Sequence, residues 1–197
     1  MTGKGISIRP AKREDAHHLL IMSLEYCAET GRCITRGAQL LNQFEREVIG
    51  KGSDYSTPQL ARRLLQHAKE RHAGTLSILN RHAAKLGDKL GKEGDNGADF
   101  IIVAGKKRIG FCGIGVTGGK AEIAPLYVLE GHRGSGVARK ALNDLLAFAK
   151  AKGAETATSM VHSKEGEALM KAAGAKVKRE WWPFGQKMAT VELGRNP

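Results

Sequence analysis

The stretch IAPLYVLEGHRGSGVARKA, residues 123–141, decides the fold of this chain. It begins with an apolar run typical of a β-strand, continues through a turn that holds Gly134 and Gly136, and ends in an amphipathic helix. The apolar positions of that helix recur at helical spacing: Val137, Ala141, Leu142, Leu145, Phe148 and Ala149. The sequence therefore predicts a strand that runs through a glycine-rich turn into a helix.

A turn of this kind is suited to binding phosphate. The first N–H groups of a helix have no acceptor within the helix, and the helix dipole adds about half a positive charge at the same end. Gly134 and Gly136 can adopt positive φ and place no side chain in front of a phosphate, while Arg133 can add a charge-assisted contact. We interpret the turn as a cradle for a pyrophosphate. An ordinary strand-to-helix turn is the alternative, because Gly-x-Gly alone is a weak signal.

The spacing of Arg133, Gly136 and Ala138 gives the pattern Arg-x-x-Gly-x-Ala, which follows the strand IAPLYV. Together they resemble the acetyl-CoA-binding motif of the GNAT superfamily of N-acetyltransferases. The resemblance covers residues 1–31 and 99–193, and it implies acetyl-CoA as the co-substrate. The residues that it implies as acetyl-CoA contacts are Leu126, Tyr127, Val128, Arg133, Gly134, Ser135, Gly136, Val137 and Ala138.

The order of predicted elements agrees with this resemblance. A strand at residues 6–9 and a helix ending near Gly31 come first, and three meandering strands follow between residues 100 and 129. A helix, a strand at 156–161, a helix opened by Ser163 and a closing hairpin at 177–193 complete the order. The fold class that we expect is α+β, a mixed and mostly antiparallel GNAT-like sheet flanked by helices.

Residues 32–98 are an enlarged helical insertion in this interpretation, within one GNAT-like domain that spans residues 1–197. Thr57 followed by Pro58 is a typical helix start. An apolar seam then recurs at steps of three and four residues: Leu76, Leu79, Ala83, Leu86 and Leu90. We predict a two-helix unit over residues 57–90 that projects from the GNAT core, and a mobile loop over residues 91–97.

Pro125 is unusual in a central strand, because proline cannot donate a hydrogen bond to the ladder. The GNAT resemblance implies that this strand carries a bulge and diverges from the next one, so that the pantetheine arm of the co-substrate pairs with free backbone groups. An edge strand is the alternative explanation of this proline.

Glu122 opens the same strand and is the candidate general base, since amine acetylation requires loss of a proton from the amine. The segment EIAPLYV resembles the corresponding strand of histone-acetylating GNAT members, in which the leading Glu is the base. A solvated residue at a strand start is the alternative. Met170 stands where many members carry the Tyr that protonates the leaving thiolate, so Tyr127, Tyr26 or water would have to take that role.

Trp181 and Trp182 fall in the closing hairpin, as core or interface residues or as a stacking surface for the acceptor. The three cysteines, Cys27, Cys33 and Cys112, are sparse and lack metal-knuckle spacing, so we interpret them as reduced residues of a cytoplasmic protein. We see no metal-binding cluster, no apolar leader segment and no run long enough to span a membrane.

The 197 residues carry a formal net charge of +12. Residues 99–197 hold 16 Lys and Arg against 9 Asp and Glu, so the bias is largest around the proposed phosphate site. Coenzyme A is a polyanion that would use this charge, a nucleic acid could use it as well, and a solvated basic surface is the plain alternative.

Two functions follow from these observations. The first is an acetyl-CoA-dependent N-acetyltransferase with an amine acceptor of unidentified class. The second is a catalytically degenerate GNAT-fold protein that contacts nucleic acid or a protein partner through its basic surface and its helical insertion. The intact Arg-x-x-Gly-x-Ala turn favours the first, and Met170 with the large insertion favours the second. The sequence leaves the oligomeric state open.

Overall fold

The computed structural model describes residues 5–50, 55–90, 97–179 and 187–194. Contacts within the chain divide it into two compact units. The helical unit spans Ala11–Lys92, and the sheet unit joins Met1–Pro10 to Glu93–Pro197. Each unit holds an apolar core of its own. The helical unit starts at residue 11, so it includes the first helix that the sequence analysis had assigned to the GNAT core; a single domain over 1–197 stays a prediction.

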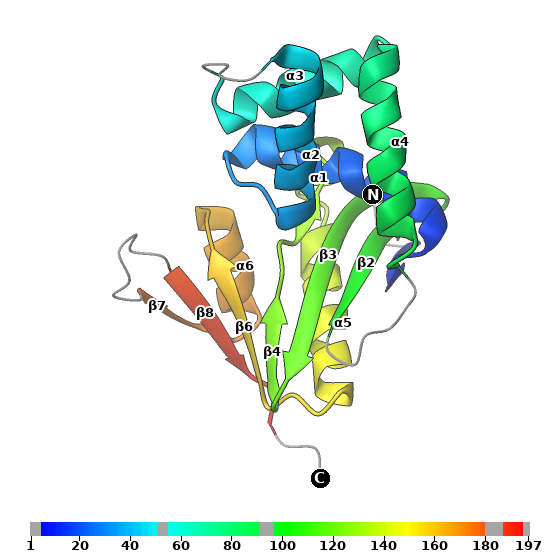
Figure 1. Ribbon diagram of the computed structural model, residues 1–197. Helices are drawn as coiled ribbons and strands as arrows, with labels where there is room; N and C mark the ends of the chain where they lie inside the picture. The colour runs from blue at the N-terminus through cyan, green and yellow to red at the C-terminus, as the bar shows by residue number, and fades with distance from the viewer. Residues whose placement is uncertain (1–4, 51–54, 91–96, 180–186, 195–197) are drawn as a thin grey trace. The chain divides into compact units, whose positions relative to one another are not determined.

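The sheet unit is built on a mixed, mostly antiparallel sheet, as predicted (Figure 1). Its strands follow the order β1-β2-β3-β4-β6-β8-β7, and β5 pairs with β3. The pair β4 and β6 is parallel, and the other pairs are antiparallel. The strands are β1 (Ile6–Pro10), β2 (Gly97–Ala104), β3 (Lys107–Thr117), β4 (Lys120–Ile123), β5 (Tyr127–Val128), β6 (Thr156–Val161), β7 (Lys176–Arg179) and β8 (Lys187–Glu192).

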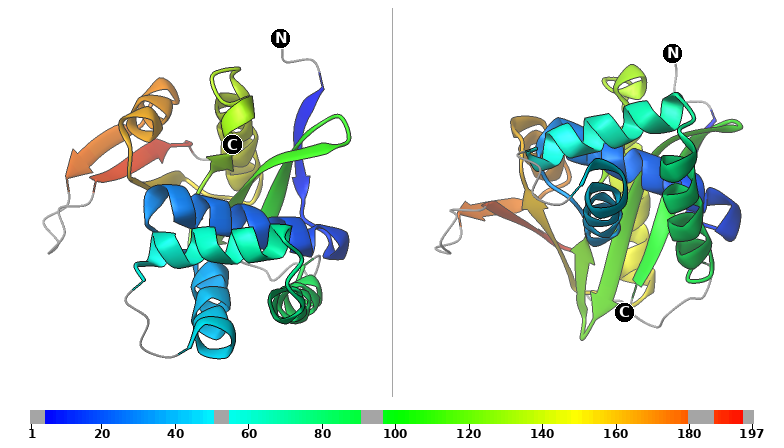
Figure 2. Two further views of the ribbon diagram at one scale, coloured as in Figure 1. Left: turned by 90° about the horizontal axis from the view of Figure 1, so that it is seen from above. Right: turned by 45° about the horizontal axis from the view of Figure 1, so that its top comes forward.

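Helices α5 (Val137–Ala151) and α6 (Lys164–Ala172) cover one face of this sheet (Figure 2). The apolar face of α5 packs on alternate residues of the strands, and the core includes Ala121, Ile123, Leu142, Leu145, Ala157 and Val191. The hydroxyl of Ser163 caps α6 by accepting the Gly166 N–H at 3.0 Å, as the sequence indicated. Because successive strand residues point to opposite faces, Glu122 lies on the face away from α5.

The strand predicted over residues 121–129 is interrupted. Ile114 of β3 pairs with Ile123, and Phe111 pairs with Tyr127, so three steps along β3 oppose four steps along the other segment. The extra residue is a β-bulge, and it falls around Pro125, whose missing N–H would otherwise break the ladder. Beyond the paired part of β4, β6 and β8 diverge from β4 (Figure 1).

The helical unit contains α1 (Ala16–Thr30), α2 (Thr35–Phe44) with a π-helical continuation over Glu45–Ile49, α3 (Thr57–Lys69) and α4 (Ala73–Gly87). The helices α3 and α4 predicted from sequence are present, but α3 packs mainly on α1, so four helices share one core. Its fully buried side chains include Leu20, Leu24, Leu40, Phe44, Leu64 and Leu79. The helix predicted to reach Leu90 ends at Gly87.

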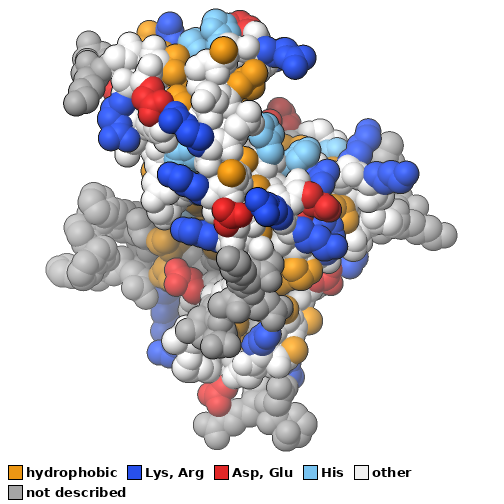
Figure 3. All heavy atoms as spheres, turned by 45° about the vertical axis from the view of Figure 1, so that its right-hand side comes forward, with side chains coloured by type: hydrophobic (Ala, Val, Ile, Leu, Met, Phe, Trp, Pro, Cys, Tyr) orange, Lys and Arg blue, Asp and Glu red, His pale blue; other side chains and the backbone are white. Residues whose placement is uncertain are grey.

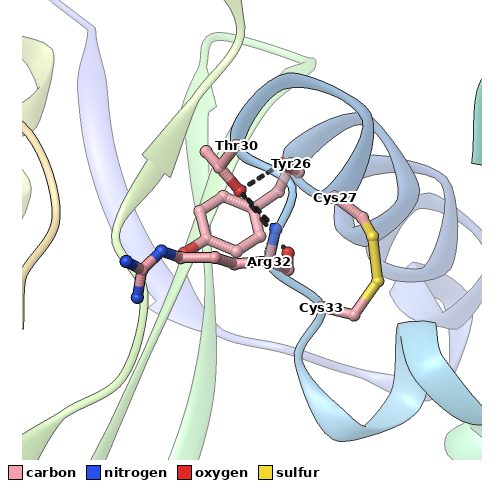
Figure 4. The surroundings of a disulfide bond; sticks show 5 residues. All are labelled: Tyr26, Cys27, Thr30, Arg32 and Cys33. Carbon is pink, nitrogen blue, oxygen red and sulfur yellow. Dashed lines mark hydrogen bonds between the residues drawn. A yellow bond between two sulfur atoms is a disulfide. The ribbon is translucent and has the colours of Figure 1, made fainter. Parts of the chain in front are cut away.

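Cys27 and Cys33 form a disulfide bond, with their Cα atoms 4.9 Å apart (Figure 4). The interpretation of both as reduced cysteines is therefore wrong. The chain reverses at Gly31, which ends α1 with φ of 72°, and the Thr30 hydroxyl accepts the Arg32 N–H at 3.2 Å, so the next turn brings the two sulfur atoms together. The expected free thiol is present at Cys112, which is buried.

Candidate functional site

The glycine-rich turn between β5 and α5 is open on its outer side. Gly134 and Gly136 have φ of 75° and 81°, and a Cβ atom added at either would meet no heavy atom within 4 Å. The Ser135 hydroxyl donates to the His132 carbonyl at 2.9 Å and closes the turn on itself. Both glycines therefore supply the left-handed backbone that the sequence analysis required of them, and both leave space above the turn.

The first turn of α5 presents unpaired backbone donors. The Lys140 N–H is the first to bond within the helix, to the Gly136 carbonyl at 3.0 Å, so the N–H groups of Val137, Ala138 and Arg139 have no acceptor in the helix. The described first turn carries no acidic residue and no side-chain cap. Exposed Arg139 and Lys140 stand there instead, although a helix dipole favours negative charge at this end. Such an end is suited to an anion.

Arg133 ties the turn to β5. Its Nε donates to the Val128 carbonyl at 2.7 Å, and its guanidinium carbon lies 5.4 Å from the centroid of the Tyr127 ring. The phosphate contact of Arg133 stays a prediction, and the structure shows that this side chain anchors the turn on the strand. No signal in the sequence pointed to that bond.

The backbone of β5 is open along one edge. The Leu129 N–H donates to the Ile109 carbonyl at 2.9 Å, so by strand alternation Tyr127 also directs its backbone groups toward β3. Leu126 and Val128 then direct theirs to the other side, where β6 diverges, and the bond from Arg133 to the Val128 carbonyl agrees with this direction. The three residues predicted to contact acetyl-CoA in this segment therefore differ in which way their backbone groups point. Those of Tyr127 point to β3 within the sheet, and those of Leu126 and Val128 point to the open edge.

Glu122 lies at the point where β4 and β6 begin to separate. It is exposed and stands in register with Gly115 of β3 and Thr158 of β6. The Thr158 hydroxyl donates to the Ala121 carbonyl at 3.2 Å, and the Ser159 hydroxyl donates to the Ile123 carbonyl at 3.3 Å. These hydroxyls hold the two strands together beside Glu122. Sequence reasoning missed them, although polar residues in the strand TATSMV were the available signal.

A family model matches the segment of the chain that carries the site. Residues 92–174 match the model of the acetyltransferase (GNAT) family, a range that includes β4, the bulge, the turn and α5. No curated protein sequence matches the chain.

Solved structures share the fold over nearly the whole chain. The PaiA N-acetyltransferase from Thermoplasma acidophilum in complex with coenzyme A is 17% identical, with a TM-score of 0.55 over 95% of this chain and 98% of that one. An acetyltransferase of the GNAT family from Streptococcus pneumoniae is 14% identical, with a TM-score of 0.56 over 96% and 99%. The yncA protein of Salmonella typhimurium, solved with acetyl-CoA, is 14% identical, with a TM-score of 0.56 over 98% and 96%. These likenesses show the GNAT fold.

Met170, which the resemblance aligns with a Tyr of many GNAT members, is part of the apolar core. It is 5% exposed and belongs to the same cluster as the inner residues of α5. Tyr127 is equally buried and packs at 5.7 Å from the Phe111 ring, while Tyr26 belongs to the helical unit. The predicted Trp181 and Trp182 lie outside the described residues. The Met170 side chain has no acidic proton, so it cannot protonate a leaving thiolate.

Other reactive groups are not part of this site. Burial raises the pKa of the Cys112 thiol to about 12, so it stays protonated and is a poor nucleophile. Within the described ranges, no group of three or more His, Cys, Asp or Glu side chains could hold a metal ion. None of the helices in the described part of the chain is long and apolar enough to cross a membrane.

Proposed function

We propose that the chain is an acetyl-CoA-dependent N-acetyltransferase that transfers acetyl directly to an amine. The observation that carries this proposal is the open, donor-rich turn of α5 next to the open edge of β5. An anion such as a pyrophosphate suits the turn, because three N–H groups without a helical acceptor and the positive end of the helix dipole meet there. Coenzyme A and acetyl-CoA are bound in fold relatives named above, which supports the choice of ligand.

The fit of the co-substrate rests on two sets of groups. The turn from Gly134 to Ala138 would hold the pyrophosphate through backbone N–H groups, with space above both glycines. The outward backbone groups of Leu126 and Val128 would pair with the amides of the pantetheine arm, as an added strand does. The bulge around Pro125 serves this arrangement, because it frees that edge from the sheet ladder.

Glu122 would act as the general base. Acetyl-CoA supplies the acetyl group as an activated thioester. The Glu122 carboxylate accepts a proton from the acceptor ammonium, the freed nitrogen lone pair forms the bond to the acetyl carbon, and the electron pair of the broken C–S bond leaves with sulfur. Water or Tyr127 returns a proton to the thiolate, since Met170 has none to give. The exposed position of Glu122 beside the strand divergence leaves it accessible to an acceptor.

A binding protein without turnover is the second candidate, and the buried Met170 favours it. Its partner would be a nucleic acid or a protein drawn by the basic surface. Figure 3 shows Lys and Arg side chains spread over the face in view with Asp and Glu among them.

Acetyl-CoA titration followed by a turnover assay separates the two candidates. We expect saturable binding by calorimetry and release of free thiol when an amine is added. Glu122→Gln should bind acetyl-CoA as the wild type does and lose about 10²–10⁴-fold in rate. Binding without turnover across peptide, small-amine and aminoacyl-tRNA acceptors would favour the binding protein, and an absence of binding at millimolar acetyl-CoA would contradict both the ligand and the activity.

A further inference from the structure

The sheet face away from α5 and α6 carries an ordered set of side chains beside Glu122. Strand register places Glu122 of β4 opposite Thr158 of β6, Thr158 opposite Thr190 of β8, and Thr190 opposite Lys176 of β7. Residues directly opposite in register share a face. We call these four residues the polar row. A second row, the methionine row, joins Met160, Met188 and Lys178 by the same register.

Both rows point away from the core. The residues that alternate with them are packed in the core on the side of α5 and α6: Ala121, Ala157, Val177 and Ala189. Glu122, Lys176 and Lys178 are exposed, while Thr158, Thr190 and Met188 are half-buried. The rows therefore form one continuous surface that the described helices of the sheet unit do not cover.

Opposite charges stand at the two ends of this surface. Glu122 is on β4, and Lys176 and Lys178 are on β7, three strands away. At about 4.8 Å between neighbouring strands, the separation is about 14 Å. Side chains stand roughly perpendicular to a sheet, so the charged ends stay well apart. Among the described residues, no ion pair joins Glu122 to either lysine.

The middle of the surface is apolar. Met160 is 46% exposed, and across the described ranges only Tyr55 joins it among large hydrophobic side chains left exposed. Met188 lies directly opposite it on β8. Flexible methionine side chains adapt to apolar groups of different shape. A ligand of this face would then have a cationic end, an apolar middle and an anionic end, in that order from β4 to β7.

We propose that the acceptor is the amino terminus of a peptide whose third or fourth residue is acidic. This proposal rests on the proposed acetyltransferase function. An extended chain advances about 3.4 Å per residue, so a fourth residue with its side chain spans the distance from Glu122 to the two lysines, whereas a single amino acid does not. The terminal amine lies at Glu122, an apolar second residue lies over Met160 and Met188, and the acidic side chain pairs with Lys176 and Lys178.

The test compares C-terminally amidated peptides that differ in one group: Ala-Leu-Ala-Glu, Ala-Leu-Ala-Gln and Ala-Leu-Ala-Lys. We expect kcat/KM for the Glu peptide to exceed that for the Gln peptide by about three- to tenfold at low salt, the range for one or two exposed ion pairs, and less at high salt. The double variant Lys176→Ala, Lys178→Ala should remove this preference by lowering kcat/KM for the Glu peptide toward that for the Gln peptide. Lys106→Ala, which removes an exposed lysine of the β2–β3 turn, is the matched control and should retain the preference.

Binding of the same peptides, labelled at the C-terminus, gives a readout that does not need turnover. If acetyl-CoA does not bind, the proposed function fails, and the Glu-over-Gln preference in peptide binding still tests this surface. Equal binding and equal turnover of the Glu and Gln peptides would overturn the proposal. A preference that survives the loss of both lysines would overturn it as well. A free glutamate that is acetylated as well as the Glu peptide would refute the peptide class.

Discussion

Gly136→Glu probes the phosphate cradle at its centre. Gly136 precedes the first residue of α5 and has φ of 81°, with no heavy atom within 4 Å of an added Cβ. A glutamate there has room, so the variant should fold. Its carboxylate, however, would occupy the space where the pyrophosphate is expected.

Gly153→Glu is the matched control, because Gly153 follows the other end of the same helix with φ of 83° and the same open space. A side chain in the left-handed region costs about 1–2 kcal/mol at either position. Both variants should therefore lose unfolding free energy in urea, and Gly153→Glu should lose more, because the helix dipole favours a carboxylate at the N-terminal end of α5 and disfavours one at the C-terminal end. Any difference in acetyl-CoA affinity then reports on the cradle alone.

The expected loss of affinity follows from Coulomb repulsion. Two like charges about 4 Å apart repel by about 1 kcal/mol in bulk water and about 4 kcal/mol at the effective dielectric of a protein surface. At 1.4 kcal/mol per tenfold, the dissociation constant of Gly136→Glu should rise by about fivefold to several hundred-fold. The effect should shrink as salt is added.

Calorimetric titration with acetyl-CoA measures this loss at two salt concentrations. Gly153→Glu should bind as the wild type does. An unchanged affinity in Gly136→Glu, or an equal loss in both variants, would refute the placement of the pyrophosphate on this turn.

Four further outcomes are expected. Glu122→Gln should slow acetyl transfer at neutral pH by about 10²–10⁴-fold. The loss should shrink at high pH, where more of the amine is already neutral. An equal loss of rate at every pH would contradict the role of Glu122 as the base. Unfolding without reductant should expose one free thiol per chain, and a count of three would contradict the disulfide. Cys27→Ser should lower the unfolding free energy by roughly 2 kcal/mol, from the entropy of a loop closed over six residues, and an unchanged urea midpoint would contradict this. Hydrogen bonds from Lys171 and Lys187 lower the pKa of Glu167 to about 2. The contribution of Glu167 to stability should therefore be complete above pH 4.5 and lost as the pH falls toward 2. A Glu167 carboxyl resonance that titrates near 4.5 would contradict the pairing of Glu167 with these two lysines.

The elements of the sheet unit were predictable because their signals are local. The strand at Thr156–Val161 and the Ser163 cap agree with the sequence analysis residue for residue. The break at Pro125 was also predictable, since a proline cannot complete a ladder. The sequence predicts a helix that reaches Leu90, because Leu90 continues the apolar seam. The helix α4 ends earlier, at Gly87.

The disulfide was not predictable, because it depends on a turn and not on a spacing. Six residues separate Cys27 from Cys33, and only the reversal at Gly31 brings them together. The sequence also could not tell which apolar core the first helix joins. Its apolar face fits any core, and the tertiary contacts with α3 decide that it belongs to the helical unit.

The backbone conformation of the glycine-rich turn was predictable, but the contacts made by the candidate residues were not. The positive φ of Gly134 and Gly136 follows from residue type. The bond from Arg133 to the Val128 carbonyl required the path of the chain. Strand register also separates Leu126 and Val128 from Tyr127, which no composition or spacing could do.

Amide chemical shifts during an acetyl-CoA titration test the central claim most directly. Nitrogen-15-labelled protein reports each backbone N–H group separately. We predict the largest shifts at the turn, residues 134–139, with further shifts at Leu126 and Val128 and smaller ones at Tyr127, whose N–H faces β3. Saturating acetyl-CoA that leaves these amides unmoved, or shifts confined to other parts of the chain, would contradict the account.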